Sequence, residues 1–165
     1  SGWIEVKTLD LKGYPWLELP SGITNLANIT SLVLSGWRNS SYSIKNIDSL
    51  ANLTNLTSLN LSDYLSLEIG NGLANMPNLT YLRLSHINNL HNVDSLAHLT
   101  NLTRLDLSYC DSLKNVDGLA NLINLSSLTF WGFFLDSNVP EPSDKSMTTR
   151  EDVAAYQKEI KKAMK

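Results

Sequence analysis

Several features are scarce or missing in this chain of 165 residues. It has a single cysteine, Cys110, which excludes a framework of internal disulfides. No apolar run approaches the roughly 18 residues that a membrane-spanning helix needs. Basic residues are not in excess, because 13 lysines and arginines stand against 16 aspartates and glutamates and the net charge is −3. We therefore expect neither a generic nucleic-acid surface nor direct insertion into a membrane.

What the sequence does have is one phrase repeated five times. The phrase is Leu-Thr-x-Leu-x-Leu-Ser, followed by a variable stretch and an apolar run ending in Leu-Ala-x-Leu-x-Asn. Units follow one another at 23 residues, except for one step of 27. A fixed period of about 20 to 29 residues with L-x-x-L-x-L inside is the signature of a leucine-rich repeat solenoid. The units begin at Val6 (a degenerate copy), Ile29, Leu56, Leu79, Leu102 and Leu125.

Each unit predicts one strand and one short helical turn. Leu105 and Leu107, for example, alternate with polar residues, which indicates a half-buried strand. Val116, Leu119 and Leu122 recur at a spacing of three, which indicates a helical turn. We therefore predict an α/β fold: a right-handed leucine-rich repeat solenoid with a parallel concave sheet of about six strands, short helical turns on the convex side and a C-terminal helix. The side chains expected to cap the turns are those of Ser21, Asp48, Asn71, Asp94 and Asp117.

The C-terminal segment has the pattern of an amphipathic helix. Thr148 and Glu151 have the spacing of a capping box, and an apolar stripe runs from Val153 to Met164. Acidic residues open the segment and lysines close it, as the helix dipole favours. We favour a cap on the last repeat, with a basic amphipathic helix for a membrane or a partner as the alternative. The predicted segments are 1–28 (N-terminal degenerate repeat and cap), 29–133 (leucine-rich repeats), 134–147 (linker) and 148–165 (C-terminal helix).

The ninth position of each unit lacks the asparagine that many leucine-rich repeats place there to bond neighbouring backbones. We therefore expect apolar packing to fill the turn after each strand. A catalytic thiol would need an exposed site that lowers its pKa, and buried core filler is the favoured interpretation of Cys110. The residues at this position are Tyr14, Tyr64, Ile87, Cys110 and Phe133.

The positions that do not repeat predict where a partner binds. Strand positions three, five, seven and eight are expected to face the concave surface. The residues at these positions are mostly small in the early units and aromatic or charged in the later ones. In the later units we expect Arg83 and Asp106 to lie close enough to pair. Tyr, Trp and Arg are enriched in interface hot spots, so we predict a protein-binding patch, with an ordinary solvated sheet face as the alternative. The patch comprises Tyr81, Arg83, His86, Arg104, Asp106, Tyr109 and Trp131.

A second candidate surface lies in the unit from Ile29, which carries four extra residues within 35–43. The insertion must bulge from the turn after that strand. It contains residue types that are enriched at hot spots. Two interpretations are open: a loop that binds a partner, and a surface loop whose tryptophan folds back to cover the base of the loop. The candidate residues are Trp37, Arg38 and Tyr42.

Two phrases carry a family resemblance: Leu-Ala-Asn-Leu-Thr-Asn-Leu-Thr-Ser-Leu-Asn-Leu-Ser at 50–62 and Leu-Ala-His-Leu-Thr-Asn-Leu-Thr-Arg-Leu-Asp-Leu-Ser at 96–108. Over about residues 5–133 the chain resembles bacterial leucine-rich repeat proteins of the internalin type. The resemblance implies a surface or secreted protein whose concave face binds a host protein. The chain departs from internalins in its period, which is one residue longer than usual, in the missing asparagine ladder and in its helical end. Leu-Ser-Tyr-Cys-Asp-Ser-Leu also resembles the repeats of plant immune receptors.

Together these patterns predict a non-catalytic protein–protein interaction module that binds its partner on the concave face. The alternative is the recognition domain of a larger effector or enzyme whose catalytic region lies elsewhere. His86, His91 and His98 do not share a face, and no Ser-His-Asp set, metal cluster or phosphate loop appears, so we predict no enzyme activity, cofactor or metal. We expect a monomer. We also expect an excised or processed domain, because the chain starts with Ser-Gly-Trp and has no signal peptide. The expected location is secreted or on a bacterial surface, with the cytoplasm as the alternative.

Overall fold

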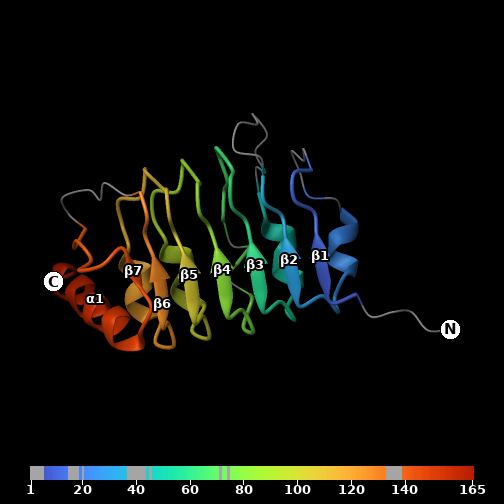
Figure 1. Ribbon diagram of the computed structural model, residues 1–165. Coiled ribbons are helices and arrows are strands. Elements are labelled where there is room, and N and C mark those ends of the chain that lie inside the picture. Colours follow the sequence, from blue (N-terminus) through green and yellow to red (C-terminus); the bar gives the residue numbers. More distant parts are fainter. Residues whose placement is uncertain are drawn as a thin grey trace.

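The protein forms a row of short strands that follow one another in chain order (Figure 1). The structure is a computed structural model and describes residues 6–14, 19, 21–36, 44, 46–70, 72–73, 75–132 and 139–165. Six strands pair in parallel, as predicted, and a seventh closes the sheet in the antiparallel sense from within the segment predicted as a linker. The strands are β1 (Thr8–Asp10), β2 (Ser31–Val33), β3 (Ser58–Asn60), β4 (Tyr81–Arg83), β5 (Arg104–Asp106), β6 (Ser127–Thr129) and β7 (Ser146–Met147).

Equivalent residues of neighbouring units face each other across the sheet. Ser31 pairs with Ser58 and Ser58 pairs with Tyr81, although the first step is 27 residues and the second is 23. The four extra residues of the longer unit therefore leave the register unchanged. In β2 to β6 the central leucine is buried, and so is the residue two positions further on, which gives two apolar columns through the stack. The columns are Leu32, Leu59, Leu82, Leu105 and Leu128, and Leu34, Leu61, Leu84, Leu107 and Phe130.

Short 3-10 turns lie behind the sheet, as predicted, but their amides are satisfied differently. The aspartates expected at the N-cap begin the turns instead, and the N-cap residues of η2, η3 and η4 are Ile47, Val93 and Val116, which make no side-chain cap hydrogen bond. An asparagine two residues earlier accepts the aspartate N–H, as at Asn115 and Asp117, where the distance is 2.7 Å. This is an Asx turn, and Asn46 and Asn92 form the same one. The turns are η1 (Ser21–Asn25), η2 (Asp48–Asn52), η3 (Asp94–His98) and η4 (Asp117–Asn121); Asn71 lies outside the described residues.

An asparagine ladder is present, at a position other than the ninth. The asparagine just before each unit donates from Nδ2 to a backbone carbonyl of the preceding unit, as Asn101 does to Pro77 at 2.7 Å. Asn55, Asn78 and Asn124 do the same. A second row runs beside it, in which hydroxyls such as that of Thr103 donate to the carbonyl of the equivalent threonine one unit earlier. The ninth position has no ladder asparagine, as predicted, but this ladder just before each unit was not predicted.

The ninth position is core, as predicted, in the three later units that the structure describes. Tyr64, Ile87 and Cys110 are buried there. The packing is not purely apolar, because the Tyr64 hydroxyl donates to the Leu34 carbonyl and the Cys110 thiol donates to the equivalent carbonyl of Leu84. Two different side chains thus replace the ladder asparagine. Tyr14 departs from the prediction, since it is 58% exposed in the first unit, and Phe133 lies outside the described residues.

The C-terminal helix α1 (Arg150–Ala163) caps the last repeat. Val153, Tyr156 and Ile160 are buried, and the Tyr156 ring meets the edge of the ring of Phe130 at a centroid distance of 5.7 Å. Gln157 donates from Nε2 to two carbonyls of the η4 region. The apolar stripe is therefore used within the fold. The helix begins one residue later than the predicted capping box, because the N-cap is Thr149, bonded to Asp152, and not Thr148 with Glu151.

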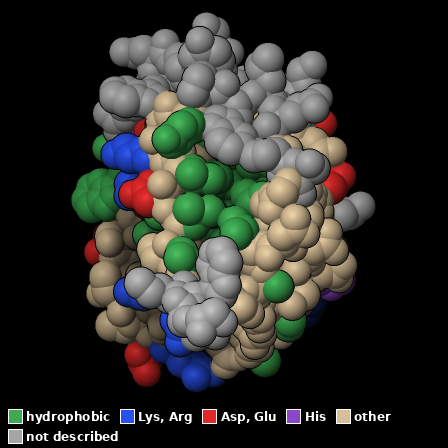
Figure 2. All heavy atoms as spheres, turned by 90° about the vertical axis from the view of Figure 1, so that its right-hand side faces the viewer, with side chains coloured by type: hydrophobic (Ala, Val, Ile, Leu, Met, Phe, Trp, Pro, Cys, Tyr) green, Lys and Arg blue, Asp and Glu red, His purple; other side chains and the backbone are tan. Residues whose placement is uncertain are grey.

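The opposite end of the solenoid is more open. Figure 2 looks at the β1 end, and hydrophobic side chains gather at its centre among the described atoms. Val6 is exposed, and Leu9, Leu11 and Leu19 are only partly buried. The predicted covering residues Trp3 and Ile4 lie outside the described residues. The two end units therefore contribute unequally to the buried core.

Replacing Leu82 by alanine should lower the free energy of unfolding by about 2–5 kcal/mol. Its side chain has no exposed surface and lies between the leucines of two neighbouring units, so the cavity cannot be filled by solvent or by collapse of a free end. Urea denaturation followed by circular dichroism measures the change. The exposed Lys158→Ala variant is the control, and a loss of stability for it as large as for Leu82→Ala would contradict the register.

Candidate functional site

The side chains that alternate with the buried leucines form the open face of the sheet, the face predicted to be concave. On β4 and β5 this face carries two cross-strand pairs, Tyr81 opposite Arg104 and Arg83 opposite Asp106. The Arg104 guanidinium carbon lies 5.1 Å from the centroid of the Tyr81 ring, which is within cation–π range. Nε of Arg83 lies 3.1 Å from Oδ2 of Asp106. The expected Arg83–Asp106 pair is thus present.

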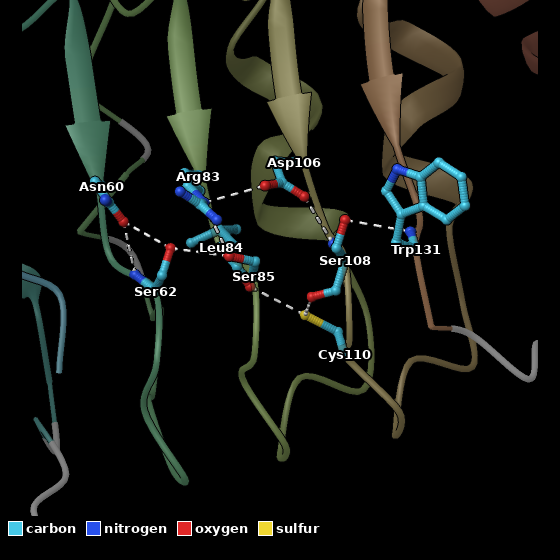
Figure 3. A network of polar contacts seen from close by, with 9 residues as sticks. All are labelled: Asn60, Ser62, Arg83, Leu84, Ser85, Asp106, Ser108, Cys110 and Trp131. Atoms are coloured by element: carbon cyan, nitrogen blue, oxygen red, sulfur yellow. Dashed lines mark hydrogen bonds and ion pairs between the residues drawn. The ribbon is translucent and has the colours of Figure 1, made fainter. Parts of the chain in front are cut away.

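The serines at position seven are not part of the open face, contrary to the expectation that this position points to a partner. Ser35, Ser62, Ser85 and Ser108 are buried. Figure 3 shows Ser62, Ser85 and Ser108 in a chain of hydrogen bonds and one ion pair that crosses the units. Nε of Arg83 donates to Oγ of Ser85 at 3.0 Å, and Oγ of Ser85 donates to Oγ of Ser62 at 3.1 Å. Position seven therefore satisfies buried polar groups and holds Arg83 in place.

Asp106 joins two parts of this network (Figure 3). Its Oδ1 accepts the N–H of Ser108 at 2.9 Å, while its Oδ2 pairs with Arg83. Asn60 makes the same local contact with Ser62 in an earlier unit. Because both oxygens of Asp106 are engaged, its main effect is to orient Arg83, and the arginine is the better placed of the two to meet a partner.

A rim of residues with positive φ follows the strands. Asp63, His86 and Tyr109 have φ of 66°, 59° and 58°, and Gly132 at the same repeat position has 83°. This left-handed conformation is unfavourable for a bulky side chain such as tyrosine. The rings of His86 and Tyr109 stack with their centroids 4.3 Å apart and an interplanar angle of 6°. A Cβ at Gly132 would overlap the Tyr109 ring, so glycine leaves the space in which that ring lies.

The rim borders a shallow hollow of about 390 Å³ beside the stacked rings. Leu65, which is 47% exposed, contributes an apolar side chain to the hollow. Asp63, Leu65 and Asn88 were not among the predicted site residues. The signal that points to this rim is the alternation of glycine with other residues at position eight, because a repeat position that accepts glycine often has positive φ.

The structure thus arranges the predicted patch in two groups. Tyr81, Arg83, Arg104 and Asp106 lie together on β4 and β5, and His86 and Tyr109 stack on the rim beyond these strands. Trp131 directly precedes Gly132 of the rim; its backbone N–H donates to Oγ of Ser108, and 51% of the residue is exposed. The insertion residues Trp37, Arg38 and Tyr42 lie outside the described residues.

Reactive groups are sparse at this surface. Burial is the main reason that the pKa of the Cys110 thiol rises from its ordinary value of 9.0 to about 12. Burial also raises the pKa of Tyr64 and of Tyr156. Among the described residues there is no group of three histidine, cysteine, aspartate or glutamate side chains that could hold a metal ion. The helices in this part of the chain are also too short or too polar to cross a membrane.

Known proteins place this geometry among the leucine-rich repeats. Residues 77–121 match the family model described as leucine rich repeats in two copies. An internalin (inlF) from Listeria monocytogenes superposes with a TM-score of 0.66 at 28% identity over 81% of this chain and 37% of its own. Internalin C2 (inlC2) from the same organism gives 0.60 at 29% identity over 78% and 53%. The chain thus spans about a third to a half of these internalin structures.

A mammalian structure matches as well. The mouse RP105/MD-1 complex contains a chain that superposes with a TM-score of 0.61 at 28% identity, over 80% of this chain and 23% of its own. No curated protein sequence matches the chain at a significant level.

The Cys110 thiol should react far more slowly in the folded protein than in urea. Its burial and raised pKa leave almost no thiolate at about pH 8. Ellman's reagent measures the rate under both conditions. Since the folded pKa is the higher one, the thiol contribution to stability is present below the ordinary pKa of 9.0 and is lost as the pH rises towards 12. Labelling of the native protein at the rate of a free thiol would contradict the buried, structural assignment.

Replacing Gly132 by alanine should destabilise the protein by at least about 1 kcal/mol, because the new Cβ meets the Tyr109 ring and the backbone has positive φ. The ring-proton chemical shifts of His86 should also change as the stack is disturbed. Gly22→Ala is the matched control, since a Cβ there meets nothing within 4 Å. The described rim is wrong if Gly132→Ala, like the control, keeps wild-type stability and leaves the ring-proton chemical shifts of His86 unchanged.

Proposed function

The chain is a leucine-rich repeat protein that resembles the internalins, and from this premise we propose that it is a non-catalytic module that binds another protein on its concave face. Leucine-rich repeat solenoids in general present extended concave surfaces for binding. The partner-binding residues are those of the predicted patch on β4, β5 and the rim. The insertion residues Trp37, Arg38 and Tyr42, which follow β2 in the sequence, are a second proposed contact.

One observation carries this proposal: among the described residues of the open face, the aromatic and arginine side chains are concentrated on β4, β5 and the adjoining rim, whereas β2 and β3 carry smaller side chains. β2 and β3 offer serines at position three, whereas β4 and β5 offer Tyr81 and Arg104 at the same position. Tyr109 and Trp131, about half exposed, extend this surface along the rim. Interfaces draw most of their binding energy from a few such residues, with tyrosine, tryptophan and arginine the most frequent.

The surface is also held rigid before any partner arrives. The Arg83 side chain is fixed by Ser85 and Asp106, and the Tyr109 ring is fixed by its stack on His86. Side chains that are already ordered lose less entropy on binding. Both groups rest on strands whose leucines are fully buried, so the spacing between them is set by the fold.

The relatives support a binding role and suggest where it operates. One matching structure is a complex between RP105 and MD-1. Two others are internalins of a bacterium, and we propose by analogy a secreted or surface-exposed bacterial protein that acts as a monomer. We do not propose catalysis. The one described thiol is buried and protonated, and among the described residues no histidines and carboxylates group together as they do in a metal site.

The double variant Tyr81→Ala/Tyr109→Ala should bind its partner protein more than about tenfold more weakly than the wild type. The experiment captures proteins from host and bacterial extracts on the folded wild-type domain, identifies them by mass spectrometry, and measures the affinity of each purified candidate by isothermal titration calorimetry. The matched control is Ile123→Ala, which removes an apolar side chain that is 62% exposed and lies off the sheet. Equal affinities for the wild type and the double variant would place the site elsewhere.

A further inference from the structure

The two arginines of the open face have unused hydrogen-bonding capacity. Arg83 uses only Nε, which is shared between Ser85 and Asp106. Arg104 lies over the ring of Tyr81 and, within the described part of the chain, forms no ion pair. No described residue accepts a hydrogen bond from the terminal Nη atoms of either guanidinium. An arginine can present several N–H groups in a fixed plane, and a carboxylate fits that plane in a bidentate manner.

The backbone positions of the two arginines are close enough for one ligand to reach both. Arg83 and Arg104 are diagonal neighbours, because Arg83 faces Asp106 and Arg104 faces Tyr81 in the register of β4 and β5. With strands about 4.8 Å apart and alternate residues about 6.6 Å apart, the Cα atoms of diagonal neighbours lie about 8 Å apart. Alternate residues of an extended peptide lie about 6.6–6.8 Å apart on the same side. One face of an extended peptide can therefore bring a carboxylate to each arginine.

The local charge favours an acidic ligand although the whole chain does not. The four central strands β3 to β6 carry two arginines and one aspartate, while the net charge of the chain is −3. Asp106 offsets one arginine and leaves one positive charge in excess. The flanking position-three residues are Ser58 and Ser127, which are small and leave access to the guanidiniums. At physiological salt, charges separated by more than about 8 Å are largely screened, so the net charge of the whole chain is a weak guide to the charge that a ligand meets at these two arginines.

We propose that Arg83 and Arg104 form a carboxylate clamp that binds an acidic, extended segment of the partner protein, with acidic side chains at alternate positions. This inference rests on the proposed function and specifies the chemistry of the partner at that site. Tyr81 supports the clamp through its contact with Arg104, and Asp106 supports it by orienting Arg83.

The test uses fluorescein-labelled decapeptides as probes. One alternates glutamate and serine, and its counterpart has glutamine in place of every glutamate. Fluorescence anisotropy of the full chain should show saturable binding of the glutamate peptide, at least about tenfold tighter than that of the glutamine peptide. The double variant Arg83→Gln/Arg104→Gln should lose this preference. Lys114→Gln removes an exposed positive charge outside the sheet and should keep it.

Three results would overturn the clamp. These are no saturable binding of the glutamate peptide, equal binding of the two peptides, and equal weakening by Lys114→Gln and by the arginine variants. All three arginine and lysine positions are partly or fully exposed, and thermal unfolding verifies that the variants are folded.

A comparison with the captured partner separates this inference from the proposed function. If the double tyrosine variant loses the partner and the double arginine variant binds it as the wild type does, the clamp is wrong and the proposed function stands. If neither variant loses the partner, both are wrong. Loss in both variants, with the glutamate preference confirmed, supports both.

Discussion

The structure depends on one constraint: no unit can bury its own leucines, so each unit must stack in register on its neighbours. Leu59, Leu82 and Leu105 reach zero or nearly zero exposure only because equivalent leucines lie on either side. The register is held at three levels, by the parallel strands, by threonine hydroxyls and by asparagine amides that reach the preceding unit. Every other feature is placed by this stacking, including the spacing of the residues on the open face and the need for a cap at an end.

The sequence predicted most of what this constraint dictates. The leucine columns, the six parallel strands and the short turns follow from periods that repeat at each unit, and the C-terminal helix follows from its own apolar stripe. Apart from the exposed Tyr14 and strand β7 in the predicted linker, the errors concern polar side chains, whose partners depend on details of one or two residues. Asp48 and Asp117 were expected to cap the turns, yet Asn46 and Asn115 do so, because both residue types can accept the same amide. The serines of position seven alternate like surface residues but lie under the rim, where the chain leaves the strand geometry.

The candidate site was predictable in composition and only partly in geometry. Register alone places Arg83 opposite Asp106 and Tyr81 opposite Arg104, so these contacts could be read from the repeat. The stack of His86 on Tyr109 could not, since it depends on a left-handed backbone at both residues and on the missing Cβ of Gly132. Asp63 and Leu65 were not predicted for a related reason: the hollow that they line is formed by the rim residues with positive φ, which leave the direction of the strands.

The longer second unit shows how such a scaffold can diversify. Four additional residues between β2 and β3 leave Ser31 opposite Ser58 and the neighbouring leucines fully buried. Loop length after a strand is thus uncoupled from the core, and a change there does not propagate along the array. In evolution this allows a recognition loop to vary freely on a fixed frame, and in protein engineering it makes the same turn a site for grafting foreign binding loops.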